Sequence, residues 1–177
     1  MKQRADSFGI DTERLTLRVP TLADFDESAA MLNNPDVTRY LGARSFSREE
    51  CWMRHLRSVG HWQLFGIGFW IVRERQSGFF VGVVGFGEFR REIQPSFEGS
   101  PEAGWVLAAP AHRRGYATEA ARAGHEWFET RNGAKRTVCM IEDGNDASLR
   151  VAAKCGYREF TRTRYKNAPV IVLERLP

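Results

Sequence analysis

Apolar and polar residues alternate along some stretches of the chain, and apolar residues recur every three to four positions along others. Alternation is typical of a half-buried β-strand, and the wider spacing is typical of a helix with one buried face. The alternating or β-rich stretches predict strands at residues 13–19, 68–73, 79–89, 102–107, 136–141, 157–165 and 170–176. The helical spacing predicts helices at residues 22–32, 47–63, 117–131 and 145–156. Residues 1–11 show neither pattern, so we expect a loose lead-in to a single domain that spans residues 1–177.

Turn and capping residues lie where these elements are expected to begin and end. Thr21 and Ser47 precede the first two helices, and acidic residues follow in the first turn, as helix starts prefer. The Asn-Asn-Pro sequence at residues 33–35 is expected to stop the first helix. Short polar segments at residues 75–78 and 166–169 each separate two strands and predict two hairpins.

The composition is that of an ordinary globular protein, with 42% hydrophobic and 27% charged residues. The net charge of +4 suits an anionic small-molecule ligand, but a solvated surface explains it equally well. The basic residues are scattered and form no nucleic-acid-binding motif, so we expect no nucleic-acid partner. No signal peptide and no bilayer-spanning apolar run is present, which predicts a cytoplasmic protein without a membrane partner. Cys51, Cys139 and Cys155 lack metal-ligand spacing, so no metal site is expected.

Residues 105–121 join a predicted strand to a predicted helix through a basic turn. Their sequence, WVLAAPAHRRGYATEAA, places His112, Arg113 and Arg114 immediately before Gly115. A glycine in this place lets successive backbone N–H groups converge, and the positive end of the helix dipole adds to their attraction for phosphate. An ordinary strand-to-helix turn would show the same residues, so this segment alone does not establish a phosphate site.

A second segment, one strand further along, changes this interpretation. It reads NDAS at residues 145–148 and continues to KCGY at residues 154–157. Together with residues 112–120, it resembles the acetyl-CoA-binding core of the GNAT N-acetyltransferases. Residues 12–18 (TERLTLR) and 34–37 (NPDV) resemble more narrowly the Rim-type branch, which includes acetyltransferases of ribosomal-protein N-termini. The resemblance covers nearly the whole chain.

The resemblance implies an α/β (α+β) fold with a mixed, twisted and splayed sheet of six to seven strands and about four helices. Acetyl-CoA would be the co-substrate and would lie where the sheet splays, with no metal required. The residues implied to bind the acetyl-pantetheine arm are Trp105, Val106 and Leu107, with Asn145 near the pantetheine. The pyrophosphate would lie on the backbone amides of His112, Arg113, Arg114, Gly115, Tyr116, Ala117 and Thr118. In this arrangement the arginines add charge, while Gly115 supplies the shape.

Acetylation of an amine needs a base for the proton, a donor for the oxyanion and an acid for the leaving sulfur. The backbone N–H near Val106 is the expected oxyanion donor. Glu102 is the expected base, acting through a water, because strand alternation places it on the same face as Val106. A solvated strand-end carboxylate is the other interpretation of Glu102, and Glu88 is the alternate base. The family's frequent tyrosine acid corresponds to Ala152 here, so Ser148 is the replacement candidate, although it would also serve as a helix cap.

The sequence therefore predicts an enzyme that transfers an acetyl group from acetyl-CoA to a primary amine by direct attack in a ternary complex. The acceptor is expected to be a protein N-terminal amine or a small-molecule amine, bound by residues 30–65, residues 90–100 and the terminal hairpin. An acyl-CoA-binding pseudoenzyme or sensor is the alternative, because position 152 lacks a tyrosine. A kinase is disfavoured because no Gly-x-x-x-x-Gly-Lys-Ser/Thr motif is present. The resemblance is also compatible with a homodimer.

Overall fold

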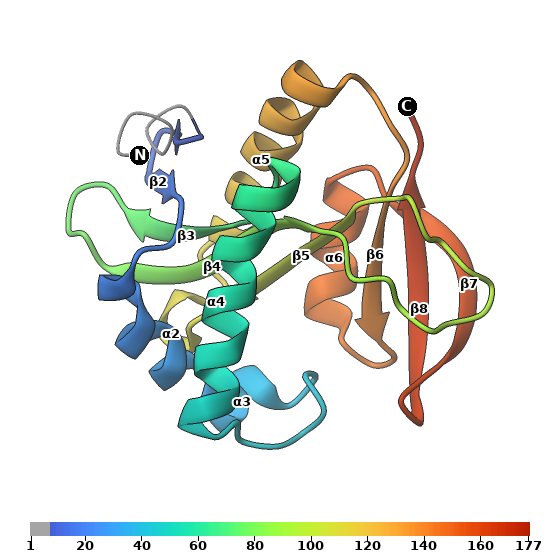
Figure 1. The fold of residues 1–177 in the computed structure, drawn as a ribbon, viewed down its shortest axis with the longest axis horizontal. Coiled ribbons are helices and arrows are strands. Elements are labelled where there is room, and N and C mark those ends of the chain that lie inside the picture. The colour runs from blue at the N-terminus through green and yellow to red at the C-terminus, as the bar shows by residue number, and fades with distance from the viewer. Residues whose placement is uncertain (1–7) are drawn as a thin grey trace.

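The computed structural model describes residues 8–177 and shows one mixed β-sheet flanked by helices (Figure 1). The strands are β1 (Ile10–Asp11), β2 (Leu15–Arg18), β3 (Phe69–Glu74), β4 (Phe80–Gly87), β5 (Glu102–Leu107), β6 (Thr137–Glu142), β7 (Arg158–Tyr165) and β8 (Ala168–Arg175). The helices are α2 (Phe25–Leu32), α3 (Pro35–Thr38), α4 (Arg48–Phe65), α5 (Tyr116–Asn132) and α6 (Asp146–Lys154), with 3₁₀ turns at Leu22–Asp24 and Ala109–Ala111. The expected α/β fold is confirmed, and the described residues form eight strands where six to seven were expected. No helix in this part of the chain combines the length and apolarity needed to cross a membrane.

The sheet opens between its fifth and sixth strands. Its order is β1-β2-β3-β4-β5-β6-β8-β7, and β5 and β6 are the parallel pair among antiparallel neighbours. β5 pairs with β4 over its whole length, from Leu107 opposite Gly82 to Glu102 opposite Gly87. β5 and β6 share one residue pair, Glu102 opposite Val138. The strands therefore diverge beyond Glu102, and the β1–β5 half of the sheet separates from the β6–β8 half (Figure 1).

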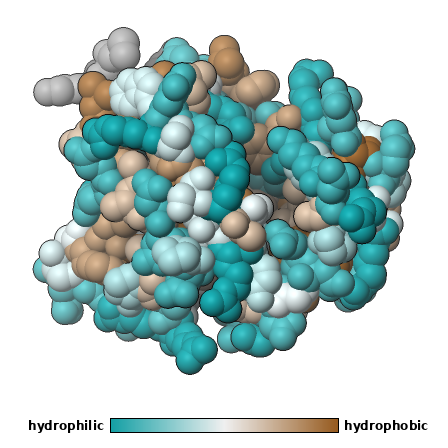
Figure 2. All heavy atoms as spheres, turned by 90° about the horizontal axis from the view of Figure 1, so that it is seen from below, coloured by the Kyte–Doolittle hydropathy of each residue, from teal (hydrophilic) through white to brown (hydrophobic). Residues whose placement is uncertain are grey.

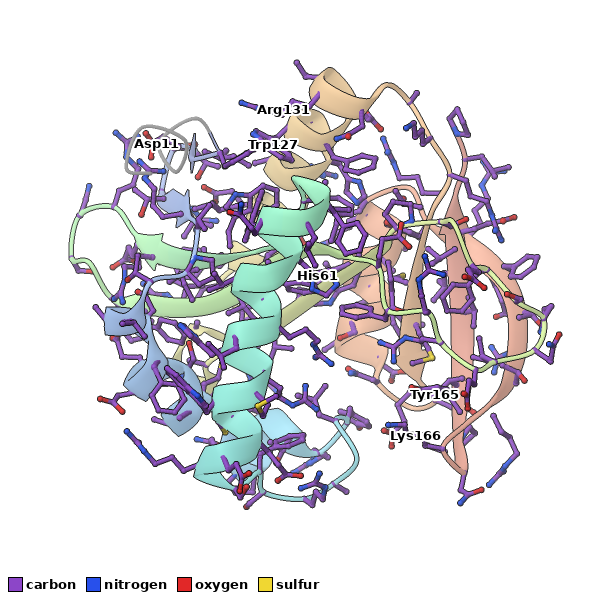
Figure 3. All side chains as sticks on the ribbon, viewed as in Figure 1. Asp11, His61, Trp127, Arg131, Tyr165 and Lys166 are labelled. Atoms are coloured by element: carbon purple, nitrogen blue, oxygen red, sulfur yellow. The ribbon has the colours of Figure 1, made fainter. Side chains whose placement is uncertain are left out.

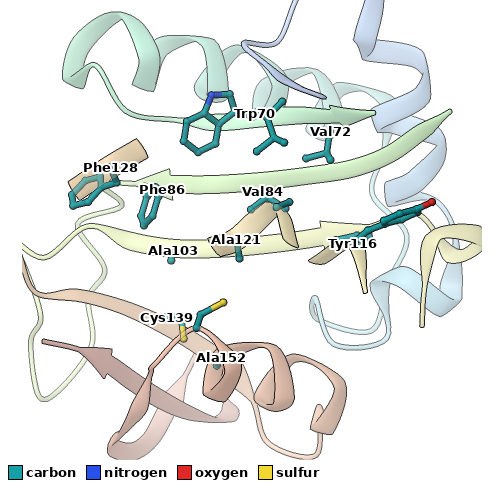
Figure 4. Close-up of a cluster of buried hydrophobic side chains, with 14 of the residues drawn as sticks. Trp70, Val72, Val84, Phe86, Ala103, Tyr116, Ala121, Phe128, Cys139 and Ala152 are labelled. Atoms are coloured by element: carbon teal, nitrogen blue, oxygen red, sulfur yellow. The ribbon is translucent and has the colours of Figure 1, made fainter. Parts of the chain in front are cut away.

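Alternation along the strands divides the apolar core between the two faces of the sheet. Trp70 and Phe86 point to the face that α5 covers, where they pack in one cluster with Phe128 (Figure 4). Ile71, the strand neighbour of Trp70, points to the other face and packs with Phe25 of α2. The strands are thus buried on both faces, which fixes their register.

The N-terminal segment is packed against the core from Phe8 onward, which corrects the expectation of a loose lead-in at residues 8–11. The Phe8 carbonyl accepts a hydrogen bond of 2.7 Å from the Trp70 indole, and the Phe8 ring lies 5.2 Å from that of Trp62. Ile10 and Asp11 pair with β2. Residues 1–7 lie outside the described part of the chain. The sequence pattern missed these contacts because a single aromatic side chain, without periodicity, makes them.

Capping interactions explain where the helices before β3 begin. Ser47 accepts a hydrogen bond of 3.1 Å from the Glu50 N–H, and the Glu50 carboxylate accepts one of 2.8 Å from the Ser47 N–H. This capping box confirms the predicted start of α4. The short helix α3 was not predicted. Asn34 caps it by accepting from the Asp36 N–H at 2.9 Å, and Pro35 fills its first position. Asparagine before proline thus starts a helix here as well as ending one.

Both predicted hairpins are present, and the second has a tighter turn than expected. β7 and β8 pair from Tyr165 opposite Ala168, so only Lys166 and Asn167 connect them. These two residues have φ values of 48° and 68°. Two successive positive φ values give the turn that matches the right-handed twist of antiparallel strands.

His125 of α5 is buried in the core without a hydrogen-bond partner. Its ring lies 5.0 Å from that of Phe86 and 5.5 Å from that of Tyr157, and neither ring nitrogen bonds to another described residue. Burial, with a smaller contribution from Arg175, lowers the pKa of His125 from 6.5 to about 4. The imidazole therefore stays neutral in the folded protein over a pH range in which the unfolded chain is protonated.

We predict that the free energy of unfolding falls as the pH is lowered from 6.5 to about 4, because the unfolded chain binds a proton that the folded chain excludes. This pKa difference corresponds to about 3 kcal/mol of the free energy of unfolding. That stability is present in full above the unfolded-state pKa and is lost as the pH falls toward the folded-state pKa. His125→Leu, which keeps a side chain of similar volume, should remove this loss. Urea titrations across the interval measure it, and an unchanged pH dependence in the variant would contradict the assignment.

Candidate active site

The strand register determines which backbone groups of β5 face the open side of the sheet. The Val138 N–H donates to the Pro101 carbonyl at 3.0 Å, so the backbone groups of odd-numbered residues in this strand face β6. The Ala108 N–H donates to the Val81 carbonyl at 2.9 Å, which places the groups of even-numbered residues toward β4. This parity holds along β5 because its pairing with β4 is continuous.

Trp105 and Leu107 therefore direct their N–H groups into the gap where β5 has left β6. The Leu107 carbonyl accepts a hydrogen bond of 3.0 Å from His112 Nε2, which closes this end of the strand edge. Val106 faces the other way, because it lies opposite Val83 and its N–H belongs to the β4 ladder. In this register, the oxyanion donor expected near Val106 is not the amide of Val106 itself. The Trp105 and Leu107 amides are the candidates instead.

The turn between β5 and α5 presents a run of unpaired backbone amides. Within residues 8–177, the N–H groups of residues 113–118 donate to no protein acceptor, and the first such bond runs from Glu119 to the Gly115 carbonyl. Arg113 and Gly115 have φ values of 60° and 81°, a left-handed backbone that turns neighbouring amides to one side. These amides also lie at the positive end of α5. The segment expected to hold a pyrophosphate has the free donors that this ligand requires.

Side chains that the sequence interpretation missed fix this turn to the N-terminal strand. Arg14 donates to the Arg114 carbonyl at 3.1 Å and forms an ion pair with Glu119 at 2.6 Å. Thr12 also donates to Glu119, at 2.6 Å. The Tyr116 ring has the guanidinium groups of Arg14 and Arg114 each 4.8 Å from its centroid. Thr12 and Arg14 are 100 or more positions from the turn residues that they contact, so no local pattern marks these contacts.

The two arginines of the turn differ in what they can offer a ligand. Arg114 forms an ion pair with Glu74 at 3.1 Å, and the Tyr116 hydroxyl donates to the same carboxylate. Arg113 is exposed, and no described carboxylate forms an ion pair with it. Arg113 is therefore the arginine whose charge is free to act on a phosphate.

Ser148 lies beside the open edge of β5. Its hydroxyl oxygen accepts a hydrogen bond of 3.3 Å from the Trp105 indole. Asn145 caps α6 by accepting from the Ser148 N–H at 3.2 Å, so the Asn145 side-chain oxygen already has a structural partner. Ala152 is 0% exposed and packed in the main core cluster, which leaves no room for a tyrosine at this position. Ser148 is thus the polar α6 side chain that the structure brings to Trp105.

Glu102 is buried and paired, which rules out the interpretation of a solvated strand-end carboxylate. It is 7% exposed, and both of its oxygens accept from Arg91, with Nη2 at 2.6 Å. A carboxylate has about four acceptor sites and a bidentate guanidinium uses two, so a water can still be bound. Glu88, the alternate base, is half-buried just beyond β4 and forms no ion pair within the described chain. The Glu88 carbonyl accepts from His61 Nε2 at 3.0 Å, which ties α4 to this segment.

The surface is hollowed between the half of the molecule that carries α2 to α4 and the half that carries β6 to β8 (Figure 2). Paler and apolar atoms form the floor of this hollow, and hydrophilic residues surround it. Across residues 8–177, no group of three or more His, Cys, Asp or Glu side chains is placed to hold a metal ion. The groups described above for the candidate site are backbone donors, the Ser148 hydroxyl and the buried ion pair of Arg91 with Glu102.

The chain belongs to the GNAT acetyltransferase family. The family model described as Acetyltransferase (GNAT) domain matches residues 14–158. The uncharacterized protein YkkB of Bacillus subtilis (strain 168) is 30% identical over 168 residues, which cover 93% of each chain. A putative GNAT-family acetyltransferase from Bordetella pertussis is 32% identical with a TM-score of 0.85, covering 94% of this chain and 98% of that one. The acetyltransferase from Agrobacterium tumefaciens str. C58 is 24% identical with a TM-score of 0.82, covering 96% and 94%.

We predict that Gly115→Ala lowers the affinity for CoA about tenfold or more, because an added Cβ at a φ of 81° disturbs the run of amides. Gly66→Ala is the matched control, because Gly66 ends α4 with a φ of 66° and nothing lies within 4 Å of an added Cβ. Each substitution should cost about 1–2 kcal/mol of stability. Calorimetry with CoA separates the two effects, and equal affinity in both variants would contradict the proposed cradle.

Proposed function

We propose that this protein is an N-acetyltransferase that moves the acetyl group of acetyl-CoA to a primary amine by direct attack in a ternary complex. The observation that carries the proposal is the combination of an open strand edge at Trp105 and Leu107 with the unpaired amides of residues 113–118. A pantetheine arm contains amides that can bond to a strand edge, and a pyrophosphate suits amides at a helix N-terminus. The two features lie at the ends of one short connection, from β5 to α5.

Proteins of the same fold support acetyl-CoA as the co-substrate. Spermidine N-acetyltransferase from Vibrio cholerae, solved with CoA and spermine, has a TM-score of 0.72 at 16% identity. RimL, a ribosomal L7/L12 alpha-N-protein acetyltransferase solved with CoA, has a TM-score of 0.76 at 15% identity. Identities this low support a shared fold alone, so we do not infer the acceptor of either protein for this chain. Membership of the Rim-type branch is proposed from the pattern at residues 12–18 and 34–37.

In the proposed reaction, the lone pair of the neutral amine attacks the thioester carbonyl carbon. A C–N bond forms, the tetrahedral intermediate collapses with cleavage of the C–S bond, and the sulfur takes up a proton to leave as the thiol. The Trp105 or Leu107 N–H donates to the oxyanion that develops during attack. Because the Trp105 indole donates to the Ser148 oxygen, the Ser148 hydroxyl keeps its own proton available to hydrogen-bond the leaving sulfur.

Glu102, acting through a water, is the proposed base. It shares a face of β5 with Val106, and its outer lone pairs stay available while Arg91 holds the carboxylate in place. Glu88 is the alternative base, since no described group forms an ion pair with it. Both carboxylates lie on the segments that flank residues 89–101, at adjoining ends of β4 and β5.

Incubation of the protein with acetyl-CoA and a panel of primary amines, followed by detection of free thiol, tests the proposed activity. Thiol release that depends on the amine, with the acetylated amine identified by mass spectrometry, is the expected result. Tight CoA binding without release from any amine would favour the acyl-CoA-binding pseudoenzyme or sensor. Absence of CoA binding in calorimetry would overturn both.

We predict that Glu102→Gln lowers kcat by about 10²-fold or more, because a carboxamide cannot take a proton from the amine. The carboxamide oxygen still accepts one hydrogen bond from Arg91, so the dissociation constant for CoA should stay the same. The pH–rate profile should lose its acidic limb in this variant and keep it in the matched Glu88→Gln variant. The reverse pattern would assign the base to Glu88.

A further inference from the structure

Two arginines of α4 have no carboxylate partner within the described chain. Arg54 and Arg57 are three positions apart, so they lie on one face of the helix. Within the described chain, neither forms an ion pair, whereas Arg48 of the same helix pairs with Asp26 at 2.8 Å. One face of α4 thus carries two positive charges that form no ion pair.

Aromatic rings hold both guanidinium groups in place. Arg54 lies 4.2 Å from the centroid of the Phe46 ring, and Arg57 lies 5.2 Å from that of Phe89. Arg91 contacts the same Phe89 ring at 4.9 Å. Stacking on a ring restrains a guanidinium and leaves its N–H edge free to donate. The donors are therefore positioned before any ligand arrives.

The groups that contact Arg54 and Arg57 also contact the face of β5 that carries Glu102 and Val106. Arg91 binds Glu102, and the Phe46 ring packs in the same apolar cluster as Val106. Tyr165, at the turn between β7 and β8 (Figure 3), also contacts Arg91, whose guanidinium lies 5.0 Å from the centroid of the Tyr165 ring. The strand edge proposed to hold the thioester belongs to this same strand, β5.

The pKa values of Arg54 and Arg57 are lowered, although part of each side chain remains exposed to solvent. Burial among protein atoms is the first cause for each. Repulsion is the second, from Arg57 at Arg54 and from Arg91 at Arg57. Glu50 attracts Arg54 and Glu102 attracts Arg57, but these two carboxylates are already paired with Arg44 and Arg91. Two positive charges that repel one another are stabilised by an anion bound beside them.

A hollow of about 430 Å³ opens beside Arg54 and is lined also by Phe46 and Met53. Arg44 and Glu50 lie at its wall and pair with each other at 2.6 Å, so together they add no net charge. Glu49 completes the wall without forming an ion pair with any described residue. The volume is in the range of pockets that bind small molecules.

We propose that Arg54 and Arg57 form an anion-binding subsite for the acceptor, which is a small primary amine that also carries a carboxylate or phosphate group. This inference rests on the proposed acetyltransferase function. Guanidinium groups bind carboxylates and phosphates in two-point hydrogen-bonded geometry. The acceptor lies with its amine at β5 and its anionic end at α4. A polyamine, which is cationic along its length, is repelled from this subsite.

Matched pairs of amines test the subsite, because each pair differs only in the anionic group. Amino acids are compared with their carboxamides and O-phosphoethanolamine with ethanolamine, and spermidine is the cationic reference. Rates are expressed per concentration of unprotonated amine, since a carboxamide also changes the pKa of the amine. In at least one of these pairs, the anionic amine should have a kcat/KM about tenfold or more above that of its neutral partner. The carboxylate and phosphate arms identify which anion is preferred, and equal or better turnover of the neutral amines or of spermidine would overturn the proposal.

Variants that remove one positive charge test whether Arg54 and Arg57 cause the preference for anionic amines. Arg54→Gln and Arg57→Gln should each abolish most of the preference for the anionic amine by raising its KM. The dissociation constant for CoA should stay unchanged, which shows that the fold is intact. Arg48→Gln removes the same charge from another face of α4 and should keep the full preference. A preference that survives in the Arg54 and Arg57 variants would contradict the subsite.

A binding measurement separates failure of this inference from failure of the proposed function. Inorganic phosphate, added at constant ionic strength to CoA-saturated protein, should raise the Tm of the unsubstituted protein and of the Arg48→Gln variant. The increase should be lost in Arg54→Gln and Arg57→Gln. If no amine is acetylated, the proposed function fails, while this measurement still supports the anion subsite. An equal response in all four proteins would overturn the subsite even if acetylation occurs.

Discussion

β5 and β6 separate after a single residue pair, and each strand keeps its other neighbour along its length. β4 holds β5 through six pairs and β8 holds β6 through six more, so the sheet opens without loosening either half. The backbone groups left on the inner edge of β5 have no strand partner. A polar edge inside a protein costs free energy unless something bonds to it. This opening is the constraint on which the candidate site depends.

Side chains around the opening hold two segments in place, the turn before α5 and residues 88–101. Toward α5, Arg14 and Glu119 fasten the turn whose amides face outward, and Gly115 provides the left-handed backbone that the turn needs. Toward α4, the ion pair of Arg91 with Glu102 fixes residues 88–101 to the same strand. The turn proposed for the phosphate follows β5 and the segment fixed by Arg91 precedes β5, so both adjoin this strand. In our proposal, this arrangement brings a thioester and an amine together on one strand edge.

The sequence predicts the elements that local patterns determine and misses those that distant contacts determine. Capping at Ser47, the two hairpins and the β5–turn–α5 connection follow from spacing and turn chemistry, and the structure has them. The packing of Phe8 was missed because one ring without periodicity carries it. Alternation correctly placed Glu102 and Val106 on one side-chain face, but it does not say which backbone groups point to which neighbouring strand. That depends on register, so the sequence could not single out Trp105 and Leu107 over Val106 as the residues with free amides.

Residue-resolved amide hydrogen exchange, with and without CoA, tests the central claim most directly. The Val106 amide is bonded to β4 and should exchange slowly in both states. The Trp105 and Leu107 amides should exchange fast in the free protein and slowly with CoA bound, because the pantetheine arm then accepts from this edge. The amides of residues 113–118 should gain protection in the same step. Unchanged exchange at Trp105 and Leu107 on saturation with CoA would contradict the account.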